Sequence, residues 1–549
     1  MNIVKFCSLG GIGDVTKNIY LYETENDLVI VDCGVGFPDI NMPGVDLIIP
    51  DISYILEHKE KLRAILITHA HEDHIGALPY IWPKLQVPIY ATKLVAAFIE
   101  NKFRDYSIGE KVRVVNNGDK IRIGDFDIEY IHVNHSVPDS SHIALTVGNQ
   151  IFYHGSDFKF DWTPIDGEFS DVSKIAQVGQ RGITCLLSDC LRSEREGYTL
   201  SERVVEDQLE REMKYCRGKF IVTAHSSDIY RWQMVVNVAK KYNRQIILMG
   251  RSVEQAIDIS RLLNYLDLPQ GMLIDSRKAK NYPDSSLCIL AAGSQGQAGS
   301  ALSRIANNDH PHIKIKEGDV VVFSADPIPG NENFVHSTID SLTKLGASVS
   351  YSEVNDELHV SGHGASGELK MLMALTKPKY LIPIGGTYRH MKKYSSLAQG
   401  MGFAKQNVFL LDTGQQVVFT DKNAQMGTKL ELKNVLIDGI GIGDVGSIVL
   451  RDRQQMAKDG MVVLILPIEQ STGQIIGEIE LLSRGFVYMK QSDTLIKEAI
   501  KNVRKAIEGN ERRITDWQFL RKKAESTLEK FFYKKTARRP TILSVIVEV

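Results

Sequence analysis

Hydrophobic and polar positions at the start of the chain alternate in short runs that are typical of β-strands. Apolar residues dominate 3–9, 19–23 and 28–32, and the glycine-rich stretch 10–13 separates the first two runs. Such runs, separated by turn residues, predict a β-meander or the edge of a β-sandwich over the first ~60 residues. The glycines lack the third glycine and the βαβ context of a dinucleotide-binding fingerprint, so they predict a tight turn.

A buried strand leads into a loop that is rich in histidine. Residues 64–67 are apolar, and the pattern H-x-H-x-D-H follows as His69, His71, Asp73 and His74. Neutral imidazoles bind zinc or manganese well and a carboxylate adds a harder oxygen, so one loop can direct four donors toward two neighbouring ions. A surface loop that is rich in histidine by chance is the alternative, and the position directly after an apolar strand disfavours it.

Further candidate ligands stand near strand ends. Asp32 ends an apolar strand, and we expect its carboxylate to orient a metal-bound imidazole, because such imidazoles usually donate their second N–H to a partner. Among His132, His135 and His142, we prefer His135 as a ligand because a Ser-x-Pro-Asp turn follows it. Asp157 ends another apolar strand, where a carboxylate can bridge two metals; a helix cap is the alternative.

From about residue 201 the pattern of apolar and polar residues changes. Helical and apolar strand patterns succeed one another at 202–215, 220–224, 229–242, 245–249 and 253–265. This alternation predicts an inserted α/β domain with a parallel sheet. The Gly/Pro loops 293–296 and 327–331 follow apolar strands and are well placed to line a cleft.

A second loop also stands out as a candidate site. It reads His359-Val360-Ser361-Gly362-His363. Its small residues leave backbone N–H groups open to an anion, and His363 could give a proton to a leaving oxygen. A turn with incidental histidines would explain the loop as simply. The strand 380–384 and the loop 385–390 then return the chain to its first domain.

The C-terminal part carries most of the charge asymmetry. A polar, glycine-rich connection at 421–450 precedes an α/β domain with expected strands at 461–467, 475–481 and 541–548. Residues 497–540 hold fourteen Lys and Arg against six Asp and Glu, a difference of +8 in a chain of net charge −2. A basic segment suits an anionic partner, and a solvated helix face is the alternative.

Composition narrows the class of protein. The 549 residues are 43% hydrophobic and 24% charged, which is ordinary for a globular protein of roughly three to four domains. No apolar run approaches the ~20 residues of a membrane span and no charged leader precedes an apolar region, so we expect a cytoplasmic protein without a membrane partner. The six cysteines lack C-x-x-C spacing, which argues against a disulfide framework or a cysteine zinc site.

The H-x-H-x-D-H loop resembles that of the metallo-β-lactamase fold, whose members use two metal ions to activate a water and to hold the charge of the reacting group. Taken over the whole chain, the motifs are similar to those of ribonuclease J, the bacterial member of the β-CASP subgroup of nucleases with this fold. Besides the His loop, the matching motifs are Gly10-Gly11-Ile12-Gly13 with Lys17-Asn18, His135-Ser136-x-Pro138-Asp139-Ser140, Gly155-x-Asp157-Phe158-Lys159-Phe160, Ser188-Asp189, Gly293-Ser294-Gln295-Gly296, Ile328-Pro329-Gly330-Asn331, His359-Val360-Ser361-Gly362-His363, Asp438-Gly439-x-Gly441-x-Gly443-Asp444 and Ser483-Arg484-Gly485-Phe486.

This resemblance implies an α/β fold: a metallo-β-lactamase αββα sandwich with an inserted β-CASP α/β domain and a small C-terminal α/β domain. The expected parts are 1–201 and 358–420 for the sandwich, 202–357 for the insert, 421–455 for a linker and 456–549 for the C-terminal domain.

The resemblance also implies a metal-dependent ribonuclease with 5′→3′ exonuclease action on 5′-monophosphorylated RNA, in rRNA maturation and mRNA decay; endonuclease action stays open. Two divalent ions, zinc or manganese, are expected. By analogy His69, His71 and His135 hold one ion, Asp73 and His74 hold the other, and Asp157 bridges them. Asp73 and His363 are the expected catalytic residues. The loop His359, Val360, Ser361, Gly362 and His363 would grip a substrate phosphate, while Asp189 would support the cleft.

One position departs from the family pattern. The late loop of the family reads Pro-x-His-Gly-Glu-Tyr, and its histidine completes the second metal site, but here Gly385 stands at that position. His390, five residues on, is not expected to take its place. Loss of a ligand should weaken the second metal by at least about the 10- to 100-fold that a lost supporting partner costs.

This departure leaves several interpretations. Some bacteria carry two ribonuclease J paralogues, one of them weakly active and paired with the stronger one, and Gly385 favours the weak type. The leading interpretation is a ribonuclease of modest intrinsic activity. The runner-up is a largely structural, RNA-binding subunit of a complex with an active paralogue. A small-molecule hydrolase of the same fold is disfavoured, because the insert has no evident role there. Expected partners are RNA, a second copy or a paralogue through the C-terminal domain, and an RNA-degrading complex.

Overall fold

The computed structural model describes residues 3–39, 41–328, 330–439, 441–469, 474–487, 493–508 and 517–548. The chain divides into two compact units, one formed by Met1–Phe37 with Ile48–Val435 and the other by Pro38–Leu47 with Leu436–Val549. Each unit has a hydrophobic core of its own.

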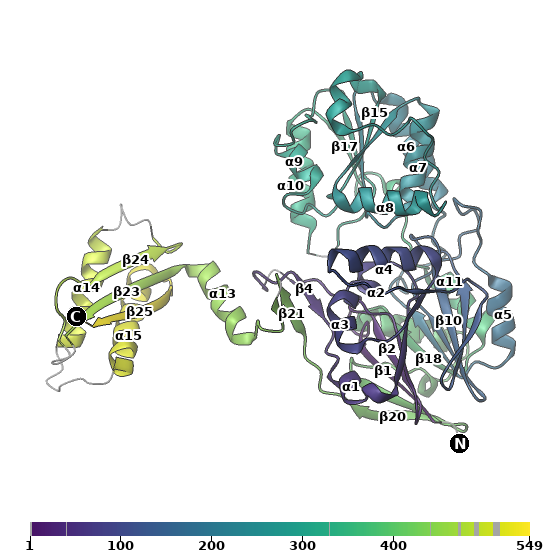
Figure 1. Ribbon diagram of the computed structural model, residues 1–549, viewed down its shortest axis with the longest axis horizontal. Coiled ribbons are helices and arrows are strands. Elements are labelled where there is room, and N and C mark those ends of the chain that lie inside the picture. The colour runs from purple at the N-terminus through teal and green to yellow at the C-terminus, as the bar shows by residue number, and fades with distance from the viewer. Residues whose placement is uncertain are drawn as a thin grey trace. The chain divides into compact units, whose positions relative to one another are not determined.

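The first unit is built on two large sheets (Figure 1). The eight-stranded sheet has the order β20 (Ala424–Lys429), β19 (Gln415–Phe419), β1 (Val4–Gly10), β2 (Ile19–Glu23), β3 (Leu28–Val31), β5 (Leu62–Leu66), β6 (Ile89–Ala91) and β7 (Arg113–Val114). The six-stranded sheet has the order β18 (Tyr380–Ile384), β12 (Cys185–Asp189), β11 (Gln150–Gly155), β10 (Ser141–Val147), β9 (Phe126–His132) and β8 (Lys120–Ile123).

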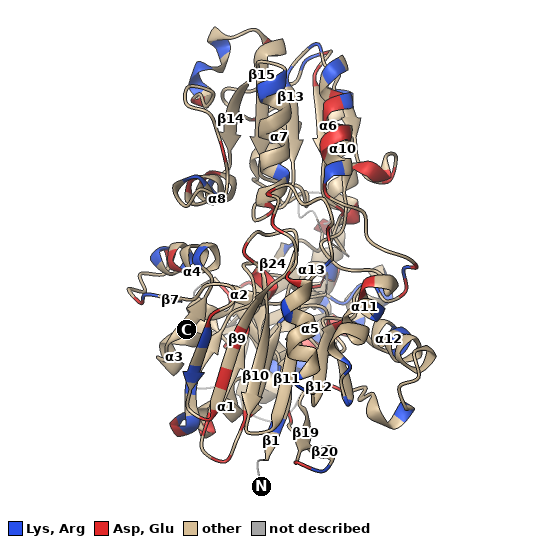
Figure 2. Ribbon diagram, turned by 90° about the vertical axis from the view of Figure 1, so that its right-hand side faces the viewer, with Lys and Arg blue, Asp and Glu red and all other residues tan. Residues whose placement is uncertain are grey.

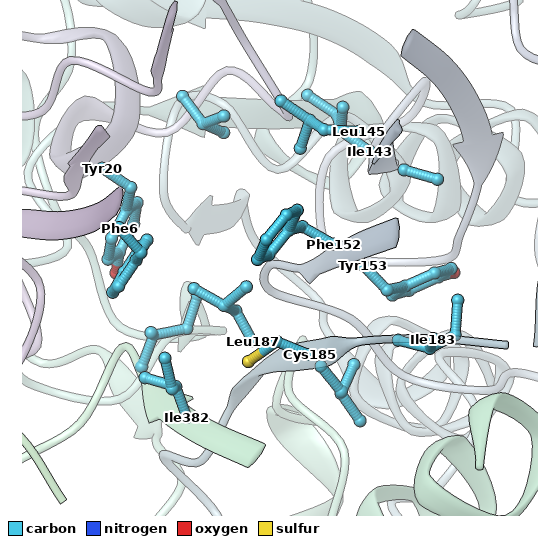
Figure 3. Packing of buried hydrophobic residues seen from close by; sticks show 14 of the residues in the cluster. Phe6, Tyr20, Ile143, Leu145, Phe152, Tyr153, Ile183, Cys185, Leu187 and Ile382 are labelled. Carbon is cyan, nitrogen blue, oxygen red and sulfur yellow. The ribbon is translucent and has the colours of Figure 1, made fainter. Parts of the chain in front are cut away.

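A single apolar core joins these two sheets. Phe6 and Tyr20 of the first sheet and Phe152 and Leu187 of the second belong to one buried cluster (Figure 3). Every residue of β11 and β12 is buried, as the continuous apolar runs predict, because a strand covered on both faces has no polar side. Charged residues are accordingly scarce along β10, β11 and β12 (Figure 2).

Helices cover the outer faces of the sandwich. The helices are α1 (Ser53–Glu57), α2 (Glu72–Ile75), α3 (Leu78–Leu85), α4 (Lys93–Asp105), α5 (Val172–Gln180), α11 (Ser366–Thr376) and α12 (Tyr388–Gly400). Helix α4 contacts β6 and β7 of the first sheet, while α11 and α12 contact β12 and β18 of the second. The layers are therefore those of the expected αββα sandwich.

The sequence pattern over 78–103 predicts helix throughout, and this prediction was wrong in one respect. The chain forms two helices, α3 and α4, with the short strand β6 between them. Gln86 has a φ of 55°, the left-handed conformation that ends α3, and Ile89 then pairs with Ile65 of β5. A three-residue strand is too short for its alternation to stand out against the helical pattern on either side.

The inserted segment forms the expected parallel sheet between helices (Figure 1). The strand order is β14 (Gln245–Met249), β15 (Leu287–Ala291), β13 (Phe220–Thr223), β16 (Val320–Phe323) and β17 (Ser348–Ser350). The flanking helices are α6 (Arg203–Tyr215), α7 (Ile229–Lys241), α8 (Arg251–Leu262), α9 (Ala301–Ala306) and α10 (Glu332–Lys344). Two apolar clusters, one on each face of this sheet, hold the layers together.

The second unit contains a three-stranded sheet in the order β24 (Glu480–Arg484), β23 (Met461–Ile468) and β25 (Thr541–Glu548). Helices α14 (Asp493–Glu508) and α15 (Trp517–Thr536) bury their apolar residues with those of the sheet, and α13 (Ser447–Asp459) precedes it. The strand expected at 475–481 was misplaced: Ile475 makes only an isolated bridge to Ile468, and the strand itself begins at Glu480.

An early segment of the chain belongs to this second unit. The Asp46 amide donates to the Ile437 carbonyl over 2.8 Å, and the Arg453 guanidinium donates to the Pro43 carbonyl over 3.3 Å. Asp438 and its neighbours lie in the hairpin of β21 (Val435–Asp438) and β22 (Gly441–Ile442), while Ile440 and Pro329 of two expected motifs lie outside the described residues. Among the helices of the described ranges, none combines the length and apolar character that crossing a bilayer requires.

Candidate metal centre

The His loop connects β5 to the single turn of α2. The Asp32 carboxylate accepts the Thr68 amide over 2.9 Å, which fixes the chain where it leaves the strand. His71 stands at the N-cap of α2, so that Asp73 and His74 lie on the first turn of the helix. Local folding alone therefore brings the four donors of the motif together.

Distant segments complete a first group of donors. His69, His71, His135 and Asp157 offer ligand atoms that all lie within 4.8 Å of one another. The Nδ1 atom of His71 is 3.1 Å from the Nε2 atoms of both His69 and His135. The Oδ2 atom of Asp157 is 3.6 Å from the Nε2 atom of His69 and 3.9 Å from that of His135. His135 and Asp157 come from loops that follow β9 and β11.

Asp157 also belongs to a second group of donors, with Asp73 and His74. The Nε2 atom of His74 lies 3.4 Å from the Oδ2 atom of Asp157 and 3.5 Å from that of Asp73. Asn18, which the sequence did not mark as a site residue, places its amide nitrogen 3.1 Å from this same Nε2 atom. The short turn after β1, where Gly11 has a φ of 74°, brings Asn18 there.

The protonation states suit metal binding. Burial lowers the pKa of His69 and of His71 well below the usual range, and it lowers the pKa of His135 to about 4. Neutral imidazoles with converging lone pairs gain little from one another, whereas a divalent cation satisfies all of them at once. Burial raises the pKa of Asp157, but the neighbouring His74 and His363 outweigh it and hold that pKa well below its usual range. The residues therefore fit divalent metal ions.

A buried carboxylate and a backbone carbonyl hold two of the imidazoles in place. The Nδ1 atom of His74 is 2.7 Å from the buried Asp32 carboxylate, so Asp32 lies where we expected an orienting carboxylate. The Nδ1 atom of His135 is 2.8 Å from the Gly362 carbonyl. A Cβ atom on Gly362 would come within 2.6 Å of the His135 ring, so only glycine allows this approach.

His363 and Asp189 form a pair beside the metal donors. The Nδ1 atom of His363 is 2.8 Å from the Oδ2 atom of Asp189, and its Nε2 atom is 3.7 Å from the Oδ2 atom of Asp157. Burial lowers the pKa of His363, but the carboxylates of Asp189 and Asp157 outweigh it and raise that pKa to about 9. Near neutral pH, His363 therefore holds a proton that it can donate.

The other side chains of the 359–363 loop lie in different surroundings: Ser361 in the turn itself, Val360 in an apolar core and His359 near an aspartate. Ser361 accepts the His363 amide over 3.1 Å, which closes a tight turn. The side chain of Val360 is buried in the core of the inserted domain, so it can offer only its backbone to a ligand. The Nε2 atom of His359 lies 3.8 Å from the Asp326 carboxylate, and His359 belongs to none of the metal-donor groups among the described residues.

The structure separates the other histidine candidates from the metal donors. His142 is buried, with its Nε2 atom 3.2 Å from the Ser156 carbonyl, and neither it nor His132 belongs to a donor group among the described residues. His390 caps α12, where its Nδ1 atom accepts the Thr387 amide over 3.3 Å. This placement agrees with the expectation that His390 does not replace a ligand.

His225 is a further buried histidine with an electrostatic effect on His71, and the sequence patterns did not mark it. It follows β13 of the inserted domain; burial and the charge of Arg231 lower its pKa, while the carboxylates of Asp326 and Asp73 act in the opposite direction. A lone histidine in an α/β segment carries no motif. Its position at the carboxyl end of a parallel strand was the one available signal, since ligands bind there.

Comparisons with known proteins assign each part of this architecture. The family models that match are the metallo-beta-lactamase superfamily over residues 12–191, the ribonuclease J beta-CASP domain over 217–342, the Zn-dependent metallo-hydrolase RNA specificity domain over 348–411 and the ribonuclease J C-terminal domain over 448–549. A protein of unknown function from Enterococcus faecalis V583 has a similar solved fold, with a TM-score of 0.54 and 14% identity over 76% of this chain and 100% of its own.

Curated relatives match over nearly their whole length. Ribonuclease J2 of Bacillus subtilis (strain 168) is 36% identical over 549 residues, which are 100% of this chain and 99% of the relative. Ribonuclease J 2 of Staphylococcus aureus (strain MRSA252) is 35% identical over 551 residues, covering 100% of this chain and 98% of the relative. Together with a metal-binding centre in a metallo-β-lactamase fold, these matches show that the chain belongs to the ribonuclease J family of β-CASP nucleases.

Proposed function

We propose that this chain is a metal-dependent ribonuclease that removes nucleotides 5′→3′ from 5′-monophosphorylated RNA, in rRNA maturation and mRNA decay, and that the same centre also supports endonuclease cleavage. The observation that carries the proposal is the position of Asp157, whose carboxylate faces both groups of metal donors and His363. A carboxylate shared in this way suits two adjacent divalent ions. Imidazole and carboxylate donors accept either zinc or manganese.

Each group then has a role in cleavage. Bound metal ions would activate a water and stabilise the charge that develops on the phosphate. His69, His71 and His135 would hold one ion, Asp73 and His74 the other. The Ser361 hydroxyl accepts the His363 amide, so the backbone N–H groups of Ser361 and Gly362 would be the ones to bind a phosphate. The protonated His363 would donate to the leaving oxygen. Asp189 keeps that proton on His363 until it is transferred.

We also propose that Gly385 limits the intrinsic activity. A Cβ atom at this position would lie 3.6 Å from the Oδ1 atom of Asp189 and 3.8 Å from that of Asp157, so a side chain here would face the metal donors. Glycine supplies none. The second ion is then held by fewer protein ligands, and its occupancy depends on the supply of metal.

Replacing Gly385 with histidine should raise the exonuclease rate on monophosphorylated RNA severalfold at limiting Mn²⁺. An added imidazole would strengthen the second metal site by about 10-fold or more, comparable with the effect of supporting partners. The backbone at Gly385 has a φ of 64°, and histidine is one of the non-glycine residues that tolerate this conformation best. The rate and the metal content per chain are the measurements.

Gly385→Asn is the matched control, because asparagine tolerates the same backbone conformation without supplying an imidazole. A rise in rate with both substitutions would show that the effect does not come from metal ligation.

A second candidate function, favoured by the same glycine, is a structural and RNA-binding subunit of a complex with an active paralogue. Absence of cleavage by both the wild type and Gly385→His at every metal concentration would support that candidate.

We further propose that the second unit pairs with a second ribonuclease J chain, either a copy of this one or a paralogue. One face of its sheet is covered by α14 and α15, while Leu482, Leu543, Val545 and Val547 of the strands stay exposed on the other. The register places Leu482 and Leu543 on either side of Val463, so these apolar side chains form one patch. Exposed apolar patches of this kind mark association sites.

The substitution Leu543→Glu should therefore convert the protein from two chains to one at micromolar concentration, because it places a charge in the middle of the apolar patch. Light scattering measures the mass directly. Lys501→Glu, an exposed change on α14, which covers the opposite face of the sheet, serves as the control and should keep the mass of two chains. A wild-type mass of one chain would contradict the proposal for a homodimer.

A further inference from the structure

Three buried charged side chains are joined by two ion pairs. They are Lys159, Glu202 and Arg231, which are 1%, 2% and 0% exposed. They come from three segments that are far apart in the sequence: the loop after β11, the N-cap of α6 and the first turn of α7. The proposed function uses none of them.

Lys159 ties this group to the metal donors. It stands two residues after Asp157, and its backbone amide donates to the Asn134 carbonyl over 2.8 Å, directly before His135. Its Nζ atom donates to the Oε1 atom of Glu202 over 2.8 Å. The backbone of both metal-binding loops is therefore fixed next to one buried carboxylate.

Arg231 links the Glu202 carboxylate to the backbone directly before the 359–363 loop. Its Nη2 atom donates to the Oε2 atom of Glu202 over 2.9 Å. Its Nη1 atom donates to the Ser324 carbonyl over 2.6 Å and to the Leu358 carbonyl over 3.3 Å. The Ser324 hydroxyl donates to the Leu358 carbonyl over 2.6 Å. Leu358 is the residue directly before His359, so this arrangement fixes the start of the 359–363 loop.

The Glu202 carboxylate remains ionised in this group. Burial raises the pKa of Glu202, but Lys159 and Arg231 outweigh it and lower that pKa to about 2. A buried ion group of this kind adds little to folding stability compared with an apolar replacement, since its attraction is offset by the loss of hydration. The ion group instead fixes the relative positions of the segments that it joins, because the planar guanidinium of Arg231 donates hydrogen bonds in set directions.

We infer that Arg231, through Glu202 and Lys159, is a positioning residue that holds the 359–363 loop at the correct place beside the metal donors. This inference rests on the proposed function. Its consequence is that the RNA phosphate is bound well only while the Arg231 contacts to Glu202 and to Leu358 are both present.

The test compares Arg231→Lys with wild type in the full-length protein. Lysine keeps the charge but cannot reach Glu202 and Leu358 together. We expect KM for a 5′-monophosphorylated oligoribonucleotide to rise about 10-fold and kcat to fall by a similar factor, since the loop carries both the phosphate contacts and His363 and a shift of up to an ångström is costly. Amide hydrogen exchange of peptides that cover 358–364 should accelerate by a similar factor, and the metal content should stay unchanged.

The matched control is Lys219→Met. Lys219 makes a buried ion pair with Asp319 over 2.7 Å in the same domain, but its partners do not include the 359–363 loop. It should lower the melting temperature without changing KM or the exchange of 358–364. If Arg231→Lys does not fold, Glu202→Gln takes its place, because the amide keeps the shape of the carboxylate and removes its charge.

Unchanged KM and unchanged exchange in Arg231→Lys, with active wild type, would overturn the inference and leave the proposed function standing. Wild type that neither binds nor cleaves RNA would instead overturn the proposed function. In that case the exchange rates alone decide the inference, since they report the position of the loop without any RNA.

Discussion

Replacing Asp157 with asparagine should reduce RNA cleavage by about three orders of magnitude, because loss of metal chemistry removes several kcal/mol of transition-state stabilisation. Asp157 is shared by both groups of metal donors and by a third group, with Asp189 and His363, among the described residues. The amide has no charge to offset two divalent ions, so both sites should lose affinity together. Elemental analysis of the purified protein and the cleavage rate at saturating Mn²⁺ are the two measurements.

Asp319→Asn is the control for this substitution. Asp319 is a fully buried aspartate that pairs with Lys219 in the inserted domain, so its loss should lower stability without changing metal content. An Asp157→Asn protein that retained its metal and cleaved RNA at the wild-type rate would refute the metal centre described above.

His363→Gln should slow cleavage by about 10²- to 10⁴-fold, the usual contribution of a positioned general acid. Glutamine keeps some hydrogen bonding to Asp189 but has no acidic proton to transfer to a leaving oxygen. The residues His69, His71 and His135 do not depend on this imidazole, so the first metal ion should remain bound. Single-turnover cleavage of monophosphorylated RNA, together with metal content, separates a chemical defect from a loss of metal.

His142→Gln provides the comparison, because His142 is a buried imidazole whose contacts lie outside the donor groups. It should affect stability and leave the chemistry unchanged. Asp189→Asn should give an intermediate rate, since it lowers the pKa of His363 without removing the imidazole. Equal rates for His363→Gln and wild type would rule out the role of His363 as the acid.

The sequence predicted those parts of the centre that local patterns encode. H-x-H-x-D-H follows an apolar strand, and Asp157 ends another, so strand ends and donor chemistry together pointed to the site. The positions of Asn18, which the motifs include without a site role, and of His225 were not predicted, because each depends on which distant loop the residue meets. The same holds for the group of Lys159, Glu202 and Arg231, whose charges look like ordinary surface charges until the three segments meet.

Two expectations for single strands failed because the elements were short. The strand β6 lies between two helices and is recognisable by its pairing with β5 more than by its own residues. Strand β24 was placed too early, because the apolar residues before it resemble its own pattern. In both cases neighbouring strands decide the structure, and a linear pattern does not contain that information.

The membership of residues 38–47 in the second unit has a consequence for synthesis and for truncation. This segment leaves the ribosome early, but its partners around Ile437 and Arg453 emerge only after some four hundred further residues have been translated. Until then the segment lacks its hydrogen-bond partners at Ile437 and Arg453. A shortened protein that stops before residue 436 would keep this loop permanently without its partners, and a protease that cuts exposed loops should find it there.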